Sequence, residues 1–219
     1  MTDTADLPTT PSLQEHVTVL DGVDIHWDSR VLEPRPWTVE QSRWAAELAG
    51  TDAPEGPILE LCAGAGHIGL LAARASGRAL VQVDVDPVAC EYARANAERA
   101  GVETDVRCAD LTGLDDAERF PLMVADPPWV PSAEVTRFPA DPLRAIDGGE
   151  DGAFLVRACL EQAGRLLQPG GHVVLQIGSD EQLALVSDHD LVVGGRLSLV
   201  EARYFDRGVL VHLRRADEV

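Results

Sequence analysis

The first part of the chain alternates apolar and polar residues over two short runs. In residues 17–27 this alternation continues on either side of Asp21-Gly22, which predicts a β-hairpin with a two-residue turn. Pro34 and Pro36 then favour extended backbone over residues 31–37, because proline restricts both itself and the residue before it. We therefore expect a hairpin followed by a Pro-rich segment.

A helix is expected after this segment. Thr38 is followed three residues later by Gln41, which is a capping-box signature, and the apolar residues that follow have helical spacing as far as Gly50. The pattern predicts a helix that begins at Thr38 and stops at Gly50.

Beyond residue 57 the pattern becomes a series of strands and helices. Short apolar runs alternate with helical patterns, which is typical of a parallel sheet with helices on both faces. The last two strands follow each other directly across Asp206-Arg207-Gly208, so they should form an antiparallel hairpin. The predicted strands are 57–63, 79–86, 104–111, 120–129, 172–179, 195–205 and 209–215, and the predicted helices are 67–75, 87–101 and 152–171.

The pattern predicts an α/β fold, namely a Rossmann-like, mostly parallel sheet of seven strands that ends in an antiparallel hairpin. We divide the chain into a disordered tail (residues 1–15), the N-terminal hairpin with its Pro-rich segment (residues 16–37) and the main domain (residues 38–219). A length of 219 residues agrees with one domain and short extensions.

The chain is strongly acidic. It has 37 Asp and Glu against 18 Arg and no Lys, which gives a net charge of −19. Such a surface repels phosphate backbones, so the charge argues against a nucleic-acid partner. The four cysteines show no C-x-x-C pair, and no signal peptide or membrane span is visible, so we expect a cytoplasmic monomer with reduced thiols.

A glycine loop follows the first strand of the main domain. Gly64-Ala65-Gly66-His67-Ile68-Gly69 fits G-x-G-x-x-G between a strand and a helix, and Asp84 ends the next strand, where a carboxylate can accept both hydroxyls of a ribose. These features indicate a ligand that contains adenosine, either a dinucleotide or S-adenosylmethionine.

Glu60 favours S-adenosylmethionine, because an acidic residue ahead of the glycines can engage the amino-acid end of that cofactor and would repel a pyrophosphate. Asp110, after the third strand, is placed to accept from an adenine amine. At this point the chain resembles the class I S-adenosylmethionine-dependent methyltransferases. The resemblance implies a methionine site lined by Cys62, Ala63, Gly64, Ala65 and Gly66, a ribose site at Asp84, and an adenine site flanked by Asp110 and Leu111.

A rigid corner follows the fourth strand, at Asp126-Pro127-Pro128-Trp129. The Asp126 side chain and the Pro127 carbonyl can accept both hydrogens of an –NH₂ group, while Trp129 stacks on its flat face, so we assign catalysis to Asp126, Pro127 and Trp129 and substrate binding to all four residues. This tetrapeptide is similar to the Asp/Asn-Pro-Pro-aromatic motif of methyltransferases that modify amide or exocyclic amine nitrogens.

Three further segments resemble the HemK-type release-factor glutamine methyltransferases: VLEPRPWT, DPLRAIDGGEDG and GGHVVLQIGSDEQ. The resemblance implies N-methylation of an amide or amine nitrogen, such as that of a protein glutamine side chain. Three residues depart from the family pattern, since Asp126 replaces Asn, Trp129 replaces Tyr and Gln176 replaces Glu. About 37 residues precede the first helix of the main domain, so we expect no helical recognition domain.

Other functions stay open. A small metabolite amine is an alternative substrate, and a nicotinamide-dependent oxidoreductase is a second class of enzyme that would use the same glycine loop. Asp147, Glu150 and Asp151 fit no known metal loop, and the histidines lack metal-ligand spacing, so we predict no metal site.

Overall fold

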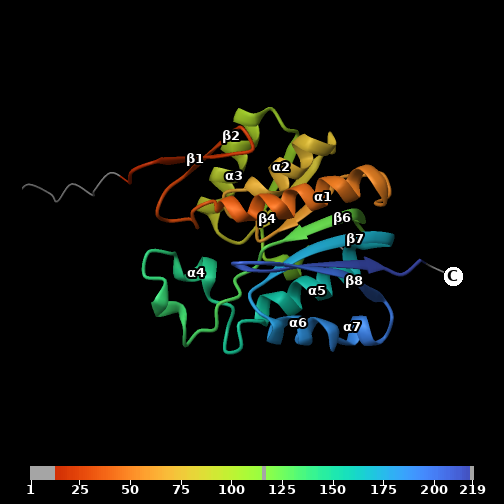
Figure 1. Ribbon diagram of the computed structural model, residues 1–219. Coiled ribbons are helices and arrows are strands. Elements are labelled where there is room, and N and C mark those ends of the chain that lie inside the picture. Colours follow the sequence, from red (N-terminus) through yellow and green to blue (C-terminus); the bar gives the residue numbers. More distant parts are fainter. Residues whose placement is uncertain (1–12, 115–116, 218–219) are drawn as a thin grey trace, which may run out of the picture.

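Seven strands form one central sheet in the computed structural model, which describes residues 13–114 and 117–217 (Figure 1). Their order is β5-β4-β3-β6-β7-β9-β8. The first five in that order are parallel, and β9 runs antiparallel to both β7 and β8. The strands are β3 (Ile58–Leu61), β4 (Leu80–Asp84), β5 (Thr104–Cys108), β6 (Phe120–Ala125), β7 (Leu167–Ile177), β8 (Leu197–Phe205) and β9 (Gly208–Arg215). The predicted fold class is confirmed.

Helices cover both faces of this sheet, as Figure 1 shows. One face packs on α1 (Val39–Thr51), α2 (His67–Ser76) and α3 (Pro87–Ala100), and the other on α5 (Phe154–Leu166), α6 (Asp180–Ser187) and α7 (Asp190–Val193). Consecutive residues of each strand point to opposite faces, so Ile58 joins the first apolar core and Leu59 the second. Both side chains are fully buried, as expected for a doubly covered parallel sheet.

The N-terminal hairpin consists of β1 (His16–Leu20) and β2 (Val23–Trp27), as predicted. Asp21 and Gly22 both have positive φ, which suits a two-residue hairpin turn. The hairpin is fixed to α3 by Asn96, whose side chain accepts from the N–H of His26 and donates to its carbonyl. Of the tail expected over residues 1–15, only residues 13–15 lie within the described part of the chain.

The start of α1 differs from the prediction. Thr38 has helical φ and ψ and makes no capping bond, because its hydroxyl donates to the Arg35 carbonyl instead. Gln41 crosses to the sheet and donates to the carbonyls of Ala125 and Val174. The capping-box prediction was therefore wrong, since tertiary partners compete for both side chains.

Several boundaries also differ. The extended Pro-rich segment stops at Arg35, because a 3₁₀ turn, η1 (Pro36–Thr38), precedes α1. The first helix passes through Gly50 to Thr51, and β7 begins at Leu167, within the range predicted as helix. The elements that the pattern did not predict are short: η2 (Leu111–Gly113), η3 (Val135–Arg137), α4 (Leu143–Ile146), α6 and α7.

Within the described residues, no helix combines the length and the apolar run that crossing a bilayer requires.

Candidate functional site

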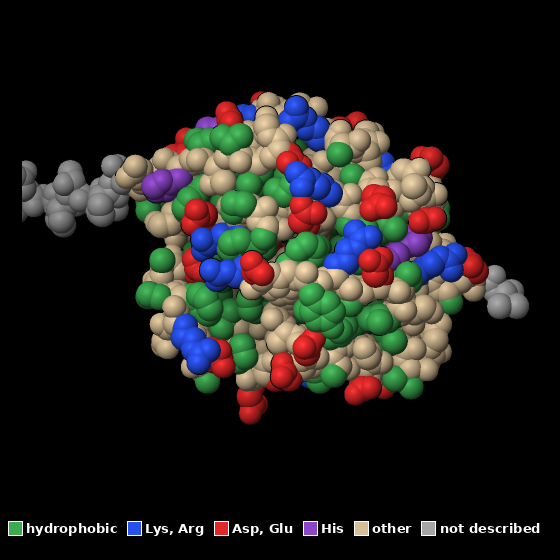
Figure 2. Space-filling view, in the orientation of Figure 1, with side chains coloured by type: hydrophobic (Ala, Val, Ile, Leu, Met, Phe, Trp, Pro, Cys, Tyr) green, Lys and Arg blue, Asp and Glu red, His purple; other side chains and the backbone are tan. Residues whose placement is uncertain are grey.

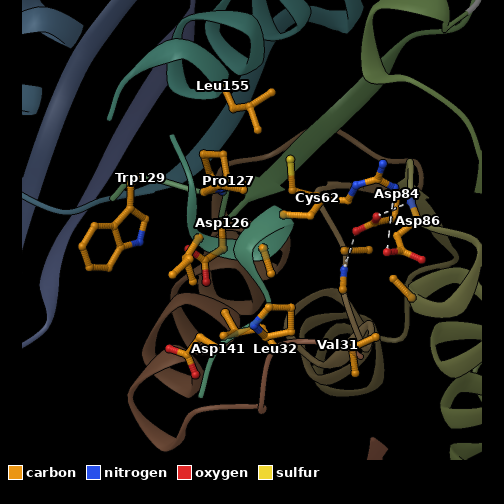
Figure 3. Close-up of a pocket in the computed structure, with 18 of the residues that line it drawn as sticks. Val31, Leu32, Cys62, Asp84, Asp86, Asp126, Pro127, Trp129, Asp141 and Leu155 are labelled. Atoms are coloured by element: carbon orange, nitrogen blue, oxygen red, sulfur yellow. Dashed lines mark hydrogen bonds and ion pairs between the residues drawn. The ribbon is translucent and has the colours of Figure 1, made fainter. Parts of the chain in front are cut away.

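A cavity of about 650 Å³ opens where the parallel strands of the sheet end. It lies at the carboxyl ends of β3, β4 and β6. The strand order reverses between β3 and β6, and ligands of doubly wound folds bind at such a switch point. Further walls come from the segment 30–38, the segment around α4, residues 109–112, the first turns of α5, Gln176 and Arg207. Figure 3 shows side chains from several of these segments around the cavity.

Gly64 and Ala65 of the glycine loop line the cavity, whereas Gly66, which was also expected there, does not. Gly64 and Gly66 both have positive φ, and a Cβ on Gly66 would lie 2.6 Å from Nε2 of Gln82 and 3.0 Å from Cα of Ala93. Asn96 donates to the carbonyl of Ala65, so the residue that fixes the N-terminal hairpin also holds the loop. Glycine is therefore required at position 66 by both conformation and space.

Glu60 does not line this cavity, which corrects the predicted contact with the ligand. Its side chain is 2% exposed and points under the loop, where it accepts from the N–H of Gly69 at 3.0 Å and from Nε2 of Gln82 at 2.5 Å. Burial raises the pKa of Glu60 to about 7. The structure therefore places Glu60 behind the loop, where it supports Gly69 and Gln82.

Asp84 lies at the end of β4 and lines the cavity (Figure 3). One carboxylate oxygen accepts from the N–H of Gly64 and the other from the N–H of Asp86, both at 2.8 Å. Burial raises the pKa of Asp84, while these two bonds lower it. Each oxygen keeps a lone pair for a further donor, so the carboxylate is oriented for a diol.

Asp110 and Leu111 lie at the far end of the cavity wall. One oxygen of Asp110 caps η2 by accepting from the N–H and the hydroxyl of Thr112, and these bonds lower the pKa of Asp110. Its other oxygen has no hydrogen-bond partner among the described residues. Leu111 is buried beside it, so this wall offers one acceptor next to an apolar surface.

Cys62 occupies a left-handed conformation, with φ of 58°, directly before the glycines. Non-glycine residues seldom adopt this conformation. Its side chain lines the cavity, Ala63 beside it is buried, and the neighbouring thiol of Cys159 together with burial raises the pKa of Cys62 well above the usual value. The thiol is therefore neutral, and all four cysteines of the chain are free.

The corner after β6 brings Asp126, Pro127, Pro128 and Trp129 to the cavity. Neither the Asp126 carboxyl group nor the Pro127 carbonyl has a hydrogen-bond partner in the described part of the chain. Burial raises the pKa of Asp126 to about 7. The site therefore presents two acceptors without partners, and the raised pKa favours the protonated form of one of them, Asp126.

Two glycines and one glutamine fix this corner. A Cβ on Gly178 would lie 2.2 Å from the Trp129 ring, and one on Gly152 would lie 2.4 Å from the Trp129 carbonyl. Gln182 of α6 donates to the carbonyls of Trp129 and Gly152, both at 2.9 Å, and accepts from the N–H of Gly178. The position of Trp129 thus depends on residues up to 53 positions away.

Thr38 and His67 close the cavity from the side of the Pro-rich segment. The Thr38 hydroxyl uses its hydrogen for the Arg35 carbonyl, so it accepts from Nε2–H of His67 at 2.8 Å. Burial lowers the pKa of His67 to about 4. His67 is therefore a neutral part of the wall, and Trp37, which precedes Thr38, also lines the cavity.

Charges of both signs line the cavity. The lining contains five arginines and six acidic residues, so it is not basic. It nevertheless holds a larger fraction of the chain's 18 arginines than of its 37 acidic residues. On the face shown in Figure 2, acidic and arginine side chains are interspersed. The arginines are Arg30, Arg35, Arg137, Arg144 and Arg207, and the acids are Glu33, Asp84, Asp86, Asp110, Asp126 and Asp141.

Sequence reasoning overlooked the buried carboxamides of the site. Gln41, Gln82, Asn96 and Gln182 each connect two or more backbone or side-chain groups around the cavity. The available signal was weak, since a Gln or Asn within an apolar pattern shows only that a polar group will be buried. Its partners depend on the fold.

Comparison with known proteins shows the family. The model of the methyltransferase small domain matches residues 46–184. The ribosomal protein uL3 glutamine methyltransferase of Burkholderia pseudomallei is 32% identical over 177 residues, which are 74% of this chain and 57% of that protein. The release factor glutamine methyltransferase of Clostridium acetobutylicum is 31% identical over 173 residues, 73% of this chain and 59% of that protein.

The chain therefore spans less than two thirds of the length of these relatives. Among solved structures, a methyltransferase from Pyrococcus furiosus superposes with a TM-score of 0.66 over 90% of both chains at 19% identity, which shows that the fold is shared.

Proposed function

The chain belongs to the methyltransferase small-domain family, and from that premise we propose that it transfers a methyl group from S-adenosylmethionine to the side-chain amide nitrogen of a protein glutamine. The names of its relatives support this substrate, since they act on a release factor and on a ribosomal protein. Family membership also removes the basis for a nicotinamide-dependent oxidoreductase. We expect the chain to act in the cytoplasm as a monomer, with residues 38–219 as the catalytic unit and residues 16–37 as part of its cavity wall.

The residues at the carboxyl ends of the strands fit the cofactor. Asp84 would accept the two ribose hydroxyls with the lone pairs that its backbone partners leave free. The free oxygen of Asp110 would accept from the adenine amine beside Leu111. The methionine end would lie along residues 62–66, where Gly64 has no side chain on the cavity side and Gly66 lets the loop pack on Gln82 and Ala93.

When bound, the cofactor supplies an electrophilic methyl group on a sulfonium. The protein's task is then to hold a nitrogen with its lone pair aimed at that methyl group, and orientation of this kind can contribute up to roughly 7–11 kcal/mol in favourable cases. The Pro127 carbonyl and the Asp126 carboxyl group would each accept one N–H, and Trp129 would cover the flat face of the group. On transfer, the bond between the methyl carbon and sulfur would break as the carbon–nitrogen bond forms, S-adenosylhomocysteine would be left, and the nitrogen would lose its proton to water.

The neutral form of Asp126 fits an amide. With its proton, the carboxyl group accepts an N–H through its carbonyl oxygen and donates O–H to the amide oxygen, as an asparagine carboxamide does. An ionised carboxylate can only accept and would face the amide oxygen with a negative charge. Because burial raises the pKa of Asp126 to about 7, the donor form is available under ordinary conditions.

The observation that carries the proposal is the pair of unpartnered acceptors, Asp126 and Pro127, at the end of β6. Calorimetry with S-adenosylhomocysteine tests the cofactor, and Asp126→Ala tests the acceptor. We expect the alanine variant to lose methyl transfer and to bind the cofactor within a few-fold of the wild type. Asp126→Asn keeps both hydrogen-bonding functions and should retain activity.

Mass spectrometry of proteins and metabolites from cells with and without the gene identifies the methylated product. Failure of the wild type to bind S-adenosylhomocysteine at micromolar concentration would refute the proposal that S-adenosylmethionine is the cofactor. Detection of a methylated metabolite amine, and no methylated protein glutamine, would refute the proposal that the substrate is a protein glutamine.

A further inference from the structure

One corner of the cavity contains polar groups that the proposed methyl transfer does not use. Gln176 of β7 is only 4% exposed and lines the cavity, yet its carboxamide has no hydrogen-bond partner among the described residues. Ala125 pairs with Leu175 in the parallel sheet, so Asp126 and Gln176 follow each other at the ends of neighbouring strands. The polar atoms of Gln176 are not sealed from solvent, so its carboxamide opens to the cavity and can bond to a ligand there.

Arg207 reaches the same corner from the turn between β8 and β9. It is exposed, and its guanidinium carbon lies 5.5 Å from the centre of the Trp37 ring. Within the described part of the chain it has neither an ion pair nor a hydrogen bond. The other arginines of the lining all pair with a carboxylate: Arg30 with Asp28, Arg35 with Glu33 and Asp141, Arg137 with Glu134, and Arg144 with Asp86.

Acidic side chains close to Gln176 and Arg207 are Asp126, on the strand next to Gln176, and Asp206, which precedes Arg207, and neither lines the hollow described next. A small hollow beside the cavity is lined by Trp37, Gln176, Phe205, Arg207 and residues 208–210. In a chain with 37 acidic residues and 18 arginines, an arginine in an acid-free hollow is unusual. The corner therefore offers a positive charge and an amide N–H, and no carboxylate of the described residues pairs with either group.

We propose, on the basis of the methyl transfer proposed above, that Gln176 and Arg207 form a subsite for a carboxylate of the substrate, next to the nitrogen held at Asp126. The carboxylate accepts from the Gln176 N–H₂ group and from the guanidinium, whose planar fork matches its two oxygens. Trp37 holds the guanidinium through a cation–π contact. The enzyme then selects glutamines that have an acidic residue close by.

The subsite also gives a reason for the two unpartnered groups. Gln176 is buried on a strand, so its N–H₂ group fixes the orientation of the carboxylate. Arg207 is exposed at a turn and attracts the carboxylate by its charge. A substrate carboxylate satisfies both at once and neutralises a cation beside Asp126. Arg207 is thus a residue that determines specificity, and it takes no part in the transfer itself.

The test uses the full chain saturated with S-adenosylhomocysteine and a set of acetylated, amidated pentapeptides. Each peptide has Gln at its centre and Gly elsewhere, with Asp or its uncharged isostere Asn at one of the flanking positions. Calorimetry measures binding. We expect an Asp peptide to bind about tenfold more tightly than its Asn counterpart, as one charge-assisted hydrogen bond predicts.

Variants test whether Gln176 and Arg207 cause the preference for Asp over Asn peptides. Arg207→Gln should remove it, and Gln176→Glu should reverse it by placing an anion in the hollow. Arg203→Gln is the matched control, because Arg203 belongs to the same hairpin but stands 3.8 Å over Trp44 and does not line the cavity. It should leave the preference unchanged.

Equal binding of Asp and Asn peptides at every position, including no binding of either, would overturn the proposal, as would a preference that survives in Arg207→Gln. These outcomes are separate from failure of the proposed function. If the wild type binds no S-adenosylhomocysteine, the methyltransferase proposal falls, whereas cofactor binding without peptide discrimination removes only the subsite.

Discussion

The raised pKa of Asp126 predicts that Asp126→Asn stabilises the protein, and more so at alkaline pH. The pKa is about 7 in the folded chain and 3.8 for an unperturbed aspartate. The folded state therefore binds more protons than the unfolded state between these values, and stability falls as pH rises from 4 to 7. Asparagine has a similar shape and no charge, so it removes this loss.

The size of the effect follows from the two pKa values. Relative to an aspartate with an unperturbed pKa, the raised pKa of Asp126 lowers stability by up to about 4.3 kcal/mol at pH 8 and about 1.7 kcal/mol at pH 5. The stabilisation by Asp126→Asn should therefore grow by about 2.6 kcal/mol at most between these pH values, because solvent in the cavity reduces the full penalty. Urea unfolding of both proteins at pH 5 and pH 8, without cofactor, measures it.

Asp110→Asn serves as the control. The pKa of Asp110 is lowered by its bonds to Thr112, so its contribution to stability is present above its unfolded pKa and is lost as pH falls. Asp110→Asn should therefore not increase the free energy of unfolding at pH 8. A free-energy difference between wild type and Asp126→Asn that is the same at pH 5 and pH 8 would show that Asp126 titrates normally, and the argument for its donor form would fail.

Three further substitutions test the support of the site. Gly178→Ala places a methyl group 2.2 Å from the Trp129 ring, so methyl transfer should fall while calorimetry still shows cofactor binding; loss of cofactor binding would contradict a local effect. Gln182→Ala leaves the carbonyls of Trp129 and Gly152 unpaired and should cost about 2–3 kcal/mol in urea unfolding, whereas no loss would refute this role. Gly50→Ala, in open space within α1, should raise stability by about 0.5–1 kcal/mol by the same assay and leave activity unchanged.

The sequence by itself determined the order and type of the long elements. Alternation across Asp21-Gly22 predicted the N-terminal hairpin, and the strand and helix periods predicted the mostly parallel sheet. It also predicted which residues would meet at the switch point, since the carboxyl ends of parallel strands share one edge. Gly64, Asp84 and Asp126 do line one cavity there. These features depend on local spacing, which is written in the chain.

Only the tertiary structure decided what polar groups do once they are buried. Glu60 was expected at the ligand and supports the loop from behind, because β3 turns it toward Gly69 and Gln82. Gln41 was expected to cap a helix and bonds to two strands instead.

The same holds for charge and for contacts between distant segments. The net charge of −19 gave no sign that Arg207 would stand without an acidic partner beside Gln176. Residues 31 positions apart meet there because β9 returns antiparallel along β7. Hydrogen bonds and pKa values depend on distances and burial across such elements, and local sequence patterns do not contain that information.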